Sequence, residues 1–169
     1  MTEYFEGYDL IDKANQQIRL GAHLSEHQIC HIMKQVLEAI NYCHKTRICH
    51  RDIKAENILI NDSDEIKIID LGFADIVSTN EKNLSGYKGT EYCMAPEILK
   101  RKAYNEKCDI WSIGVVFYVL LAISQPFTNI EDQLKGKYKP IELVKRSDLA
   151  FDLLDKMLNP NSDERISAS

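Results

Sequence analysis

The residues best suited to chemistry lie in two short segments near the middle of the chain. The first reads His50-Arg51-Asp52-Ile53-Lys54-Ala55-Glu56-Asn57, and the second, Asp70-Leu71-Gly72, begins thirteen residues after Asn57. An Asp, a Lys, an Asn and a second Asp on two loops suit phosphoryl transfer from a metal-bound nucleotide to a hydroxyl. In that reaction charge spreads over the phosphoryl oxygens, so catalysis is mostly positioning and electrostatic stabilisation.

Each residue of this set has a role in such a reaction. One carboxylate must orient the hydroxyl, and Asp52 is the candidate. Lys54 must face the developing negative charge. Asn57 and Asp70 offer the oxygen ligands that a hard divalent cation such as Mg²⁺ requires. Any one of these residues alone could simply be a polar residue of a turn. Four residue types at fixed offsets favour an active site instead.

The spacing of these residues resembles the catalytic and metal-binding loops of eukaryotic protein kinases. The resemblance implies ATP and Mg²⁺ as cofactors, and Lys54 resembles the residue of serine/threonine kinases rather than tyrosine kinases. It also implies that Arg51 pairs with a phosphorylated residue of the activation loop and orders that loop. Ser85 and Thr79 are the nearby hydroxyls, and Glu81 could substitute for a phosphate; the sequence does not choose among them.

The segment 89–97 resembles the part of the kinase family that closes the activation loop and forms the floor for the substrate peptide. Within it, Thr90 would bridge toward Asp52 and Lys54, again as in serine/threonine kinases.

Three further residues match supporting positions of the family. Glu97 would form a buried ion pair with Arg165. Asp109 matches the start of a central buried helix and would hold the backbone of the loop that begins at His50. We expect these residues to support the site rather than perform chemistry.

The resemblance assigns part of a nucleotide site to the N-terminal region. Residues Glu3 to Phe5 align with the hinge, whose backbone would bond adenine, and Leu59 aligns with the apolar floor beneath the base. Asp9 aligns with an acidic position that contacts ribose or a basic residue of the substrate. Glu56 aligns with another position that recognises the substrate. Together the two acids suggest protein or peptide substrates with Arg or Lys before the target hydroxyl; generic surface acids are the alternative.

Hydrophobic periodicity predicts the elements that must position these residues. Ser25 and Gln28 form a capping-box pattern, and apolar residues then recur at three- and four-residue steps to about Cys43, which predicts an amphipathic helix. On that helix His27 and His31 fall opposite the apolar stripe, so a solvated face is favoured over a metal site.

Beyond this helix the pattern changes several times along the chain. The stretches 58–60 and 66–69 predict two strands around a turn at 61–64, which would bring Asn57 and Asp70 to the same end. Residues 73–96 indicate a long functional loop, 109–122 a fully apolar helix, and 151–158 the last helix. A short helix is expected after Gly7.

Composition narrows the class of protein. The chain has 169 residues, which suggests one domain, and its net charge of −5 argues against non-specific binding to nucleic acid or anionic membranes. The longest apolar run is shorter than the roughly 20 residues that span a bilayer. Five cysteines without a Cys-x-x-Cys pair favour a reduced, intracellular and cytoplasmic protein over a disulfide framework.

We therefore predict a mainly α fold with a small β-hairpin, similar to the large, C-terminal lobe of a protein kinase. The resemblance covers residues 1–169 as a partial kinase domain, from the hinge through most of this lobe, with the small lobe and the final helix absent. Leu71 replaces the usual Phe and should preserve an apolar plug. The region around 120–127 and 165–168 looks most like the calcium- and calmodulin-linked kinases.

Two functional hypotheses follow. The first is a serine/threonine kinase that transfers the γ-phosphate of ATP to Ser or Thr hydroxyls of proteins. The second is a non-catalytic kinase remnant that binds partners, which the missing nucleotide clamps would favour. The retention of every catalytic residue of the large lobe favours the first.

Overall fold

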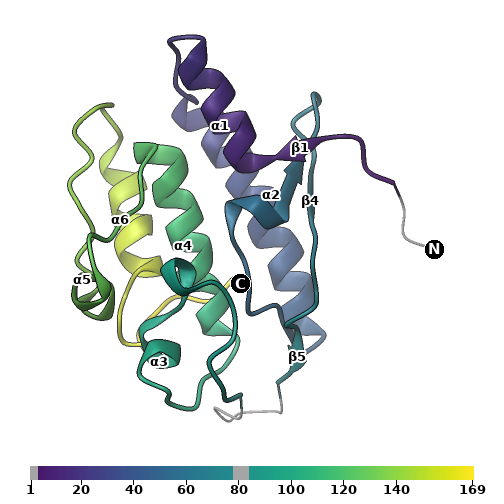
Figure 1. Cartoon of the computed structure of the whole chain (residues 1–169), viewed down its shortest axis with the longest axis vertical. Helices are drawn as coiled ribbons and strands as arrows, with labels where there is room; N and C mark the ends of the chain where they lie inside the picture. Colours follow the sequence, from purple (N-terminus) through teal and green to yellow (C-terminus); the bar gives the residue numbers. More distant parts are fainter. Residues whose placement is uncertain (1–3, 78–83) are drawn as a thin grey trace.

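The computed structural model describes residues 4–77 and 84–169, and helices are its main regular structure (Figure 1). The helices in the described part are α1 (Leu10–Arg19), α2 (Glu26–Lys45), α3 (Pro96–Leu99), α4 (Lys107–Ala122), α5 (Ile130–Lys135) and α6 (Asp148–Met157). The strands are β1 (Tyr8–Asp9), β2 (Ile48–Cys49), β3 (Ile58–Ile60), β4 (Ile66–Ile68) and β5 (Asp75–Ile76). Two 3-10 turns, η1 (Ala55–Asn57) and η2 (Glu91–Cys93), lie in the loops. The prediction of a mainly α fold is confirmed.

Helix α4 lies in the middle of the helical body, between α2 and α6 (Figure 1). It is buried on every side from Cys108 to Ala122, which agrees with the fully apolar helix that the sequence predicts. At Gly114 a Cβ atom would lie 2.9 Å from side-chain atoms of Met157 and Leu158. The glycine therefore lets the end of α6 pack directly on the α4 backbone.

Helix α2 begins with the predicted capping box. The backbone N–H of Gln28 donates to the Ser25 hydroxyl at 3.2 Å, and the Ser25 N–H donates back to the Gln28 side chain at 3.0 Å. Its buried residues follow the predicted stripe: Ile29, Ile32, Met33, Val36 and Ile40. His27 and His31 are exposed, as expected for the solvated face of this helix.

Strands β1, β3 and β4 form an antiparallel sheet with β3 in the centre. The predicted hairpin is present, with Ile58 opposite Ile68 and Ile60 opposite Ile66. Its ladder continues one step further, because Ile69 N donates to Asn57 O at 2.9 Å. The hairpin thus carries both candidate catalytic segments at one end.

A second sheet pairs β2 with β5, placing Cys49 opposite Asp75. The sequence did not predict β1, β2 or β5. Each has two residues, which is too short to show the alternation that identifies a strand.

The described parts of the region predicted as a long loop, 73–77 and 84–96, contain β5 and η2 besides irregular backbone. Thr79 and Glu81 lie outside the described residues. Leu71, which we expected to preserve an apolar plug, is 60% exposed in the described part of the chain. Helix α5, between α4 and α6, has six residues. None of the helices described combines the length and apolarity needed to cross a membrane.

Candidate active site

Asp52 lies at the centre of a group of polar side chains from two distant segments of the chain. The residue is only 4% exposed. Its Oδ1 accepts the hydroxyl of Thr90 at 2.7 Å, and its Oδ2 accepts Asn57 Nδ2 at 3.2 Å and lies 3.3 Å from Lys54 Nζ. A carboxylate has about four acceptor positions, so these three donors leave Oδ1 able to accept one more hydrogen bond.

Thr90 also contacts Lys54, whose Nζ donates to Thr90 Oγ1 at 2.9 Å. The hydroxyl therefore bridges the amine and the carboxylate. Gly89 makes this approach possible: its φ is 106°, and a Cβ at this position would lie 2.3 Å from Arg51 O. A side chain at residue 89 would push Thr90 away from Asp52.

His50 connects the two candidate catalytic segments. Its Nδ1 accepts the backbone N–H of Asp52 at 3.3 Å, which leaves Nε2 to donate to Ile69 O at 3.2 Å. The residue is 1% exposed. A buried imidazole thus ties the backbone at Asp52 to the residue that precedes Asp70.

Asn57 and Asp70 offer oxygen atoms at the same end of the hairpin. Asn57 uses its amide nitrogen on Asp52, so its amide oxygen is the atom left for a metal. Asp70 is exposed, has a positive φ of 65°, and accepts the N–H of Gly72 on Oδ1 at 3.1 Å. A neutral amide oxygen and a carboxylate are a donor set that fits Mg²⁺.

Asp109, in the first turn of α4, holds the backbone of the loop that contains Asp52. It accepts the N–H of His50 at 2.9 Å and of Arg51 at 2.8 Å, and His44 Nε2 lies 2.8 Å from its Oδ2. Burial would raise the pKa of this carboxyl group, but the hydrogen bond and charge of His44 and the two backbone donors together lower it below its ordinary value.

Arg51 has a carboxylate partner that the sequence analysis missed. Its guanidinium lies 3.0 Å from Asp75 Oδ2 and donates through Nε to Phe73 O. Ser85 is exposed, and its carbonyl accepts the Tyr104 hydroxyl at 3.4 Å. No local signal marked Asp75, because its approach to Arg51 depends on the pairing of β2 with β5.

Glu97 and Arg165 form a bidentate ion pair across 68 residues of sequence. The two nitrogen–oxygen distances are 2.7 and 3.0 Å, and Arg165 is 1% exposed. The same guanidinium donates to Asn159 O and Lys107 O. This network links the start of α3 to the start of α4 and to the C-terminal segment.

The residues aligned with a nucleotide site are brought together only in part. Asp9 lies directly opposite Leu59 in the pairing of β1 with β3, and Phe5 is half-buried. The Asp9 carboxylate caps α1 by accepting Asp12 N at 2.8 Å, so it has a structural role as well. Glu3 lies outside the described residues.

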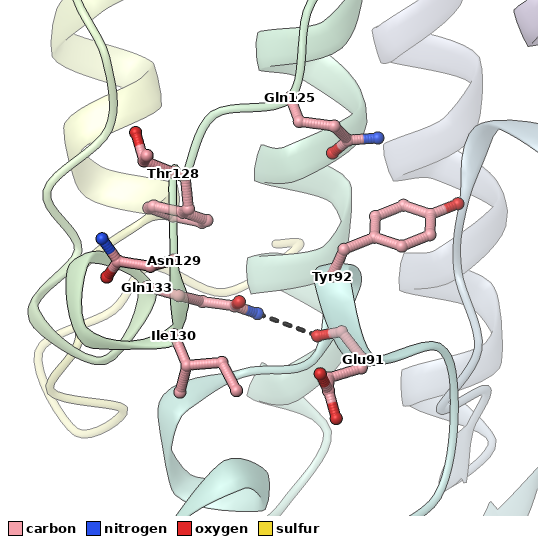
Figure 2. A pocket seen from close by; sticks show the side chains of 8 residues that line it. Glu91, Tyr92, Gln125, Thr128, Asn129, Ile130 and Gln133 are labelled. Atoms are coloured by element: carbon pink, nitrogen blue, oxygen red, sulfur yellow. Dashed lines mark hydrogen bonds between the residues drawn. The ribbon is translucent and has the colours of Figure 1, made fainter.

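A pocket lies beside Glu91 and Tyr92, the two residues that follow Thr90 in the sequence (Figure 2). Its volume is about 210 Å³, and it lies between Glu91 and Tyr92 on one side and the segment 125–133 on the other. Gln133, which is 4% exposed, donates to Glu91 O at 3.0 Å and to Met94 O at 2.8 Å. These bonds hold in place the segment after Thr90, which forms one wall of the pocket. Sequence reasoning missed Gln133, because a glutamine on a short helix carries no local signal.

Glu56 is exposed and accepts a hydrogen bond from the Tyr92 hydroxyl. Burial of the tyrosine, with the adjacent carboxylate, raises the pKa of Tyr92, so the phenol remains a donor. The contact places an acidic group beside Tyr92, one of the residues that line the pocket of Figure 2.

Comparisons with known proteins bear on the family of this chain. Residues 1–169 match the family model described as "Protein kinase domain". Calcium-dependent protein kinase 5 of Plasmodium falciparum (isolate 3D7) is 42% identical over 177 residues, which cover 98% of this chain and 30% of that protein. Serine/threonine-protein kinase cds1 of Schizosaccharomyces pombe is 38% identical over 184 residues, covering 100% of this chain and 39% of that protein. The chain spans about a third of the length of these curated relatives.

Proposed function

Because the chain belongs to the protein kinase family, as do its serine/threonine kinase relatives, we propose that it transfers the γ-phosphate of ATP to Ser or Thr hydroxyls of protein substrates. The observation that carries the proposal is the convergence of Lys54, Asn57 and Thr90 on the buried Asp52 carboxylate.

In this proposal Asp52 accepts a hydrogen bond from the substrate hydroxyl and orients its oxygen toward the phosphorus atom. The remaining acceptor position on Oδ1 supports this role, because Thr90, Asn57 and Lys54 occupy the others. The same three contacts hold the carboxylate in one orientation, so it does not need to reorganise when substrate binds.

Lys54 is proposed to stabilise charge on the transferred group. Its amine already contacts both Asp52 and Thr90, which directs a positive charge to the place where the hydroxyl and the phosphate would meet. Mg²⁺, when bound, would neutralise charge on the nucleotide phosphates. Asn57 and Asp70 are the residues that would hold it.

For the nucleotide, we propose that the backbone of Glu3 to Phe5 meets the adenine and that Leu59 lies beneath it. Asp9 is the candidate for a contact with ribose. The pairing of β1 with β3 supports a shared site, because it places Asp9 beside Leu59.

For the protein substrate, we propose a segment that passes from Asp52 to the pocket of Figure 2. Glu56 would attract an Arg or Lys near the target hydroxyl, since its carboxylate is exposed beside Tyr92. Five unpaired cysteines support the expected reduced, cytoplasmic setting.

The experiment is phosphate transfer from labelled ATP to a peptide with a basic residue before its serine, using the full natural protein. Asp52→Asn should lower kcat by about 10²–10⁴-fold. Asp152→Asn, a change at an exposed residue of α6 paired with Lys156, is the control and should leave kcat unchanged. Retention of activity in Asp52→Asn would remove this carboxylate from the mechanism.

Calorimetry separates the proposal from a non-catalytic interaction module. The proposed kinase binds ATP in the presence of Mg²⁺, and Asp70→Asn weakens that binding. If the protein binds its partners but neither ATP nor ATP with Mg²⁺, the interaction module is the better description.

A further inference from the structure

Two cysteines that no step of the proposed reaction uses lie in contact behind the candidate active site. Cys49 is the last residue of β2 and Cys108 lies in the first turn of α4. Their Sγ atoms are 3.5 Å apart, although the residues are 59 positions apart in sequence. Cys49 is 0% and Cys108 1% exposed.

We propose that Cys49 and Cys108 are a redox modification site, which low-molecular-weight disulfides such as glutathione disulfide oxidise to an intramolecular disulfide. One thiolate attacks the oxidant, forms a mixed disulfide and releases one glutathione thiol. The second thiolate attacks the protein sulfur of that mixed disulfide and releases the other. Both cysteines lose their protons, and two electrons pass to the oxidant.

The geometry favours this bond. A separation of 3.5 Å is a van der Waals contact between sulfur atoms, and the bonded distance of about 2.0 Å requires each to move by less than 1 Å. The neighbouring Cys108 thiol, burial and the charge of Asp109 raise the pKa of Cys49. The thiolate is therefore scarce at neutral pH, so the pair stays reduced until an oxidant is present and then reacts slowly.

A metal ion is the competing use of the same atoms. Cys49, Cys108 and Asp109 together bring three ligand atoms within 4.8 Å of one another. However, the Asp109 oxygens already interact with His44 and with the backbone N–H groups of His50 and Arg51. These two residues begin the segment 50–57, here called the catalytic loop. A metal would have to compete for this carboxylate, whereas a disulfide forms without it.

The position of the pair connects its oxidation to the active site. Each cysteine directly precedes one member of the His50–Asp109 contact, in which His50 N donates to Asp109 at 2.9 Å. Cys49 also lies opposite Asp75, the ion-pair partner of Arg51. A bond that draws Cys49 toward α4 therefore acts on the backbone that positions Asp52. This consequence rests on the proposed function; formation of the disulfide does not.

The test begins with the intact protein and needs no activity. The protein is incubated with glutathione disulfide, unfolded in the presence of N-ethylmaleimide, digested and analysed by mass spectrometry. We expect a cross-linked peptide pair containing Cys49 and Cys108, which dithiothreitol removes. The pair should be absent in Cys49→Ser and Cys108→Ala, and present in Cys30→Ser, which removes an exposed thiol of α2.

Refolding in a glutathione redox buffer removes the question of access to buried thiols. If Cys49 and Cys108 are still free thiols after refolding under oxidising conditions, so that N-ethylmaleimide alkylates both, the proposal is overturned. It is also overturned if Zn²⁺ protects both thiols at one equivalent and no cross-link forms in its absence.

The effect on the active site is measured separately. Oxidation should lower phosphate transfer by about ten-fold or more, with recovery on reduction, in the natural protein and in Cys30→Ser but not in Cys108→Ala. Equal loss in Cys108→Ala would overturn the link to the catalytic loop. A mapped cross-link in a protein without kinase activity would instead contradict only the proposed function.

Discussion

Thr90 donates a hydrogen bond of 2.7 Å to Oδ1 of Asp52, across 38 residues of sequence. The same hydroxyl accepts a hydrogen bond from Lys54 at 2.9 Å. A single small side chain from the segment that precedes α3 therefore sets the orientation of the candidate catalytic carboxylate and of the adjacent amine. The candidate active site is complete only when that segment lies against the catalytic loop.

Replacing Thr90 should reduce catalysis more than stability. Thr90→Val keeps the shape but removes a hydrogen bond to a charged group, which is worth about 1.5–3 kcal/mol. We expect kcat to fall by about ten- to a hundred-fold in steady-state assays, with little change in the KM for ATP. Thr90→Ser keeps the hydroxyl and should retain most of the activity. Equal kcat values for the Val and Ser variants would show that the hydroxyl has no such role.

Gly89 provides a second test of the same contact. Gly89→Ala would place a Cβ 2.3 Å from Arg51 O at a residue with a φ of 106°. We expect the free energy of unfolding, measured in urea, to fall by more than about 2 kcal/mol, and phosphate transfer to be lost.

Gly21→Ala is the matched control for this change. Gly21 also has a positive φ, of 69°, but nothing lies within 4 Å of its Cβ position. The Gly21→Ala variant should lose only about 1 kcal/mol of unfolding free energy, from backbone strain, and should retain activity. If both alanine variants lose the same stability, the close approach of residue 89 to the catalytic loop is not what requires glycine.

Local signals account for the elements that the sequence predicted well. The capping box at Ser25 and Gln28 and the stripe from Ile29 to Ile40 lie within one helix, so the order of residues alone reveals them. The hairpin of β3 and β4 is similar, because its strands are adjacent and its turn is short. The candidate catalytic residues were predicted from their fixed spacing within two loops, and the structure places them close together.

Contacts between distant segments account for what was missed. The partnership of Arg51 with Asp75 depends on a pairing of two-residue strands. The wall of the pocket at Gln133 depends on where α5 packs. The contact between Cys49 and Cys108 joins residues 59 positions apart. Each arises from tertiary packing, which leaves no periodic pattern in the sequence.

The ion pair of Glu97 with Arg165 should be important for stability. Glu97→Gln leaves the guanidinium of Arg165, which is 1% exposed, without its charged partner. Breaking a buried pair in this way costs about 3–5 kcal/mol. Thermal and urea unfolding should show this loss. Asp152→Asn, which breaks the exposed pair with Lys156, should leave the unfolding midpoint unchanged. Similar midpoints for the two variants would mean that the buried pair is not a major source of stability.

The Asp109 carboxylate predicts how stability depends on pH in the acid range. Its pKa in the folded protein lies below the ordinary value of 3.8, since the His44 and backbone donors outweigh burial. The unfolded chain therefore takes up the proton more readily than the folded one. The stabilisation from this group is present at pH values well above 3.8 and is lost as the pH falls toward the lower, folded pKa.

Asp109→Asn isolates this contribution. At neutral pH the variant should be less stable by about 1–3 kcal/mol, because an amide presents one acceptor oxygen to the two backbone N–H groups of His50 and Arg51. Urea unfolding between about pH 3 and pH 7 should show this difference shrinking as the pH falls, since the natural protein loses its Asp109 contribution and the variant has none to lose. A difference that stays constant over this range would mean that the charge of Asp109 does not hold the catalytic loop.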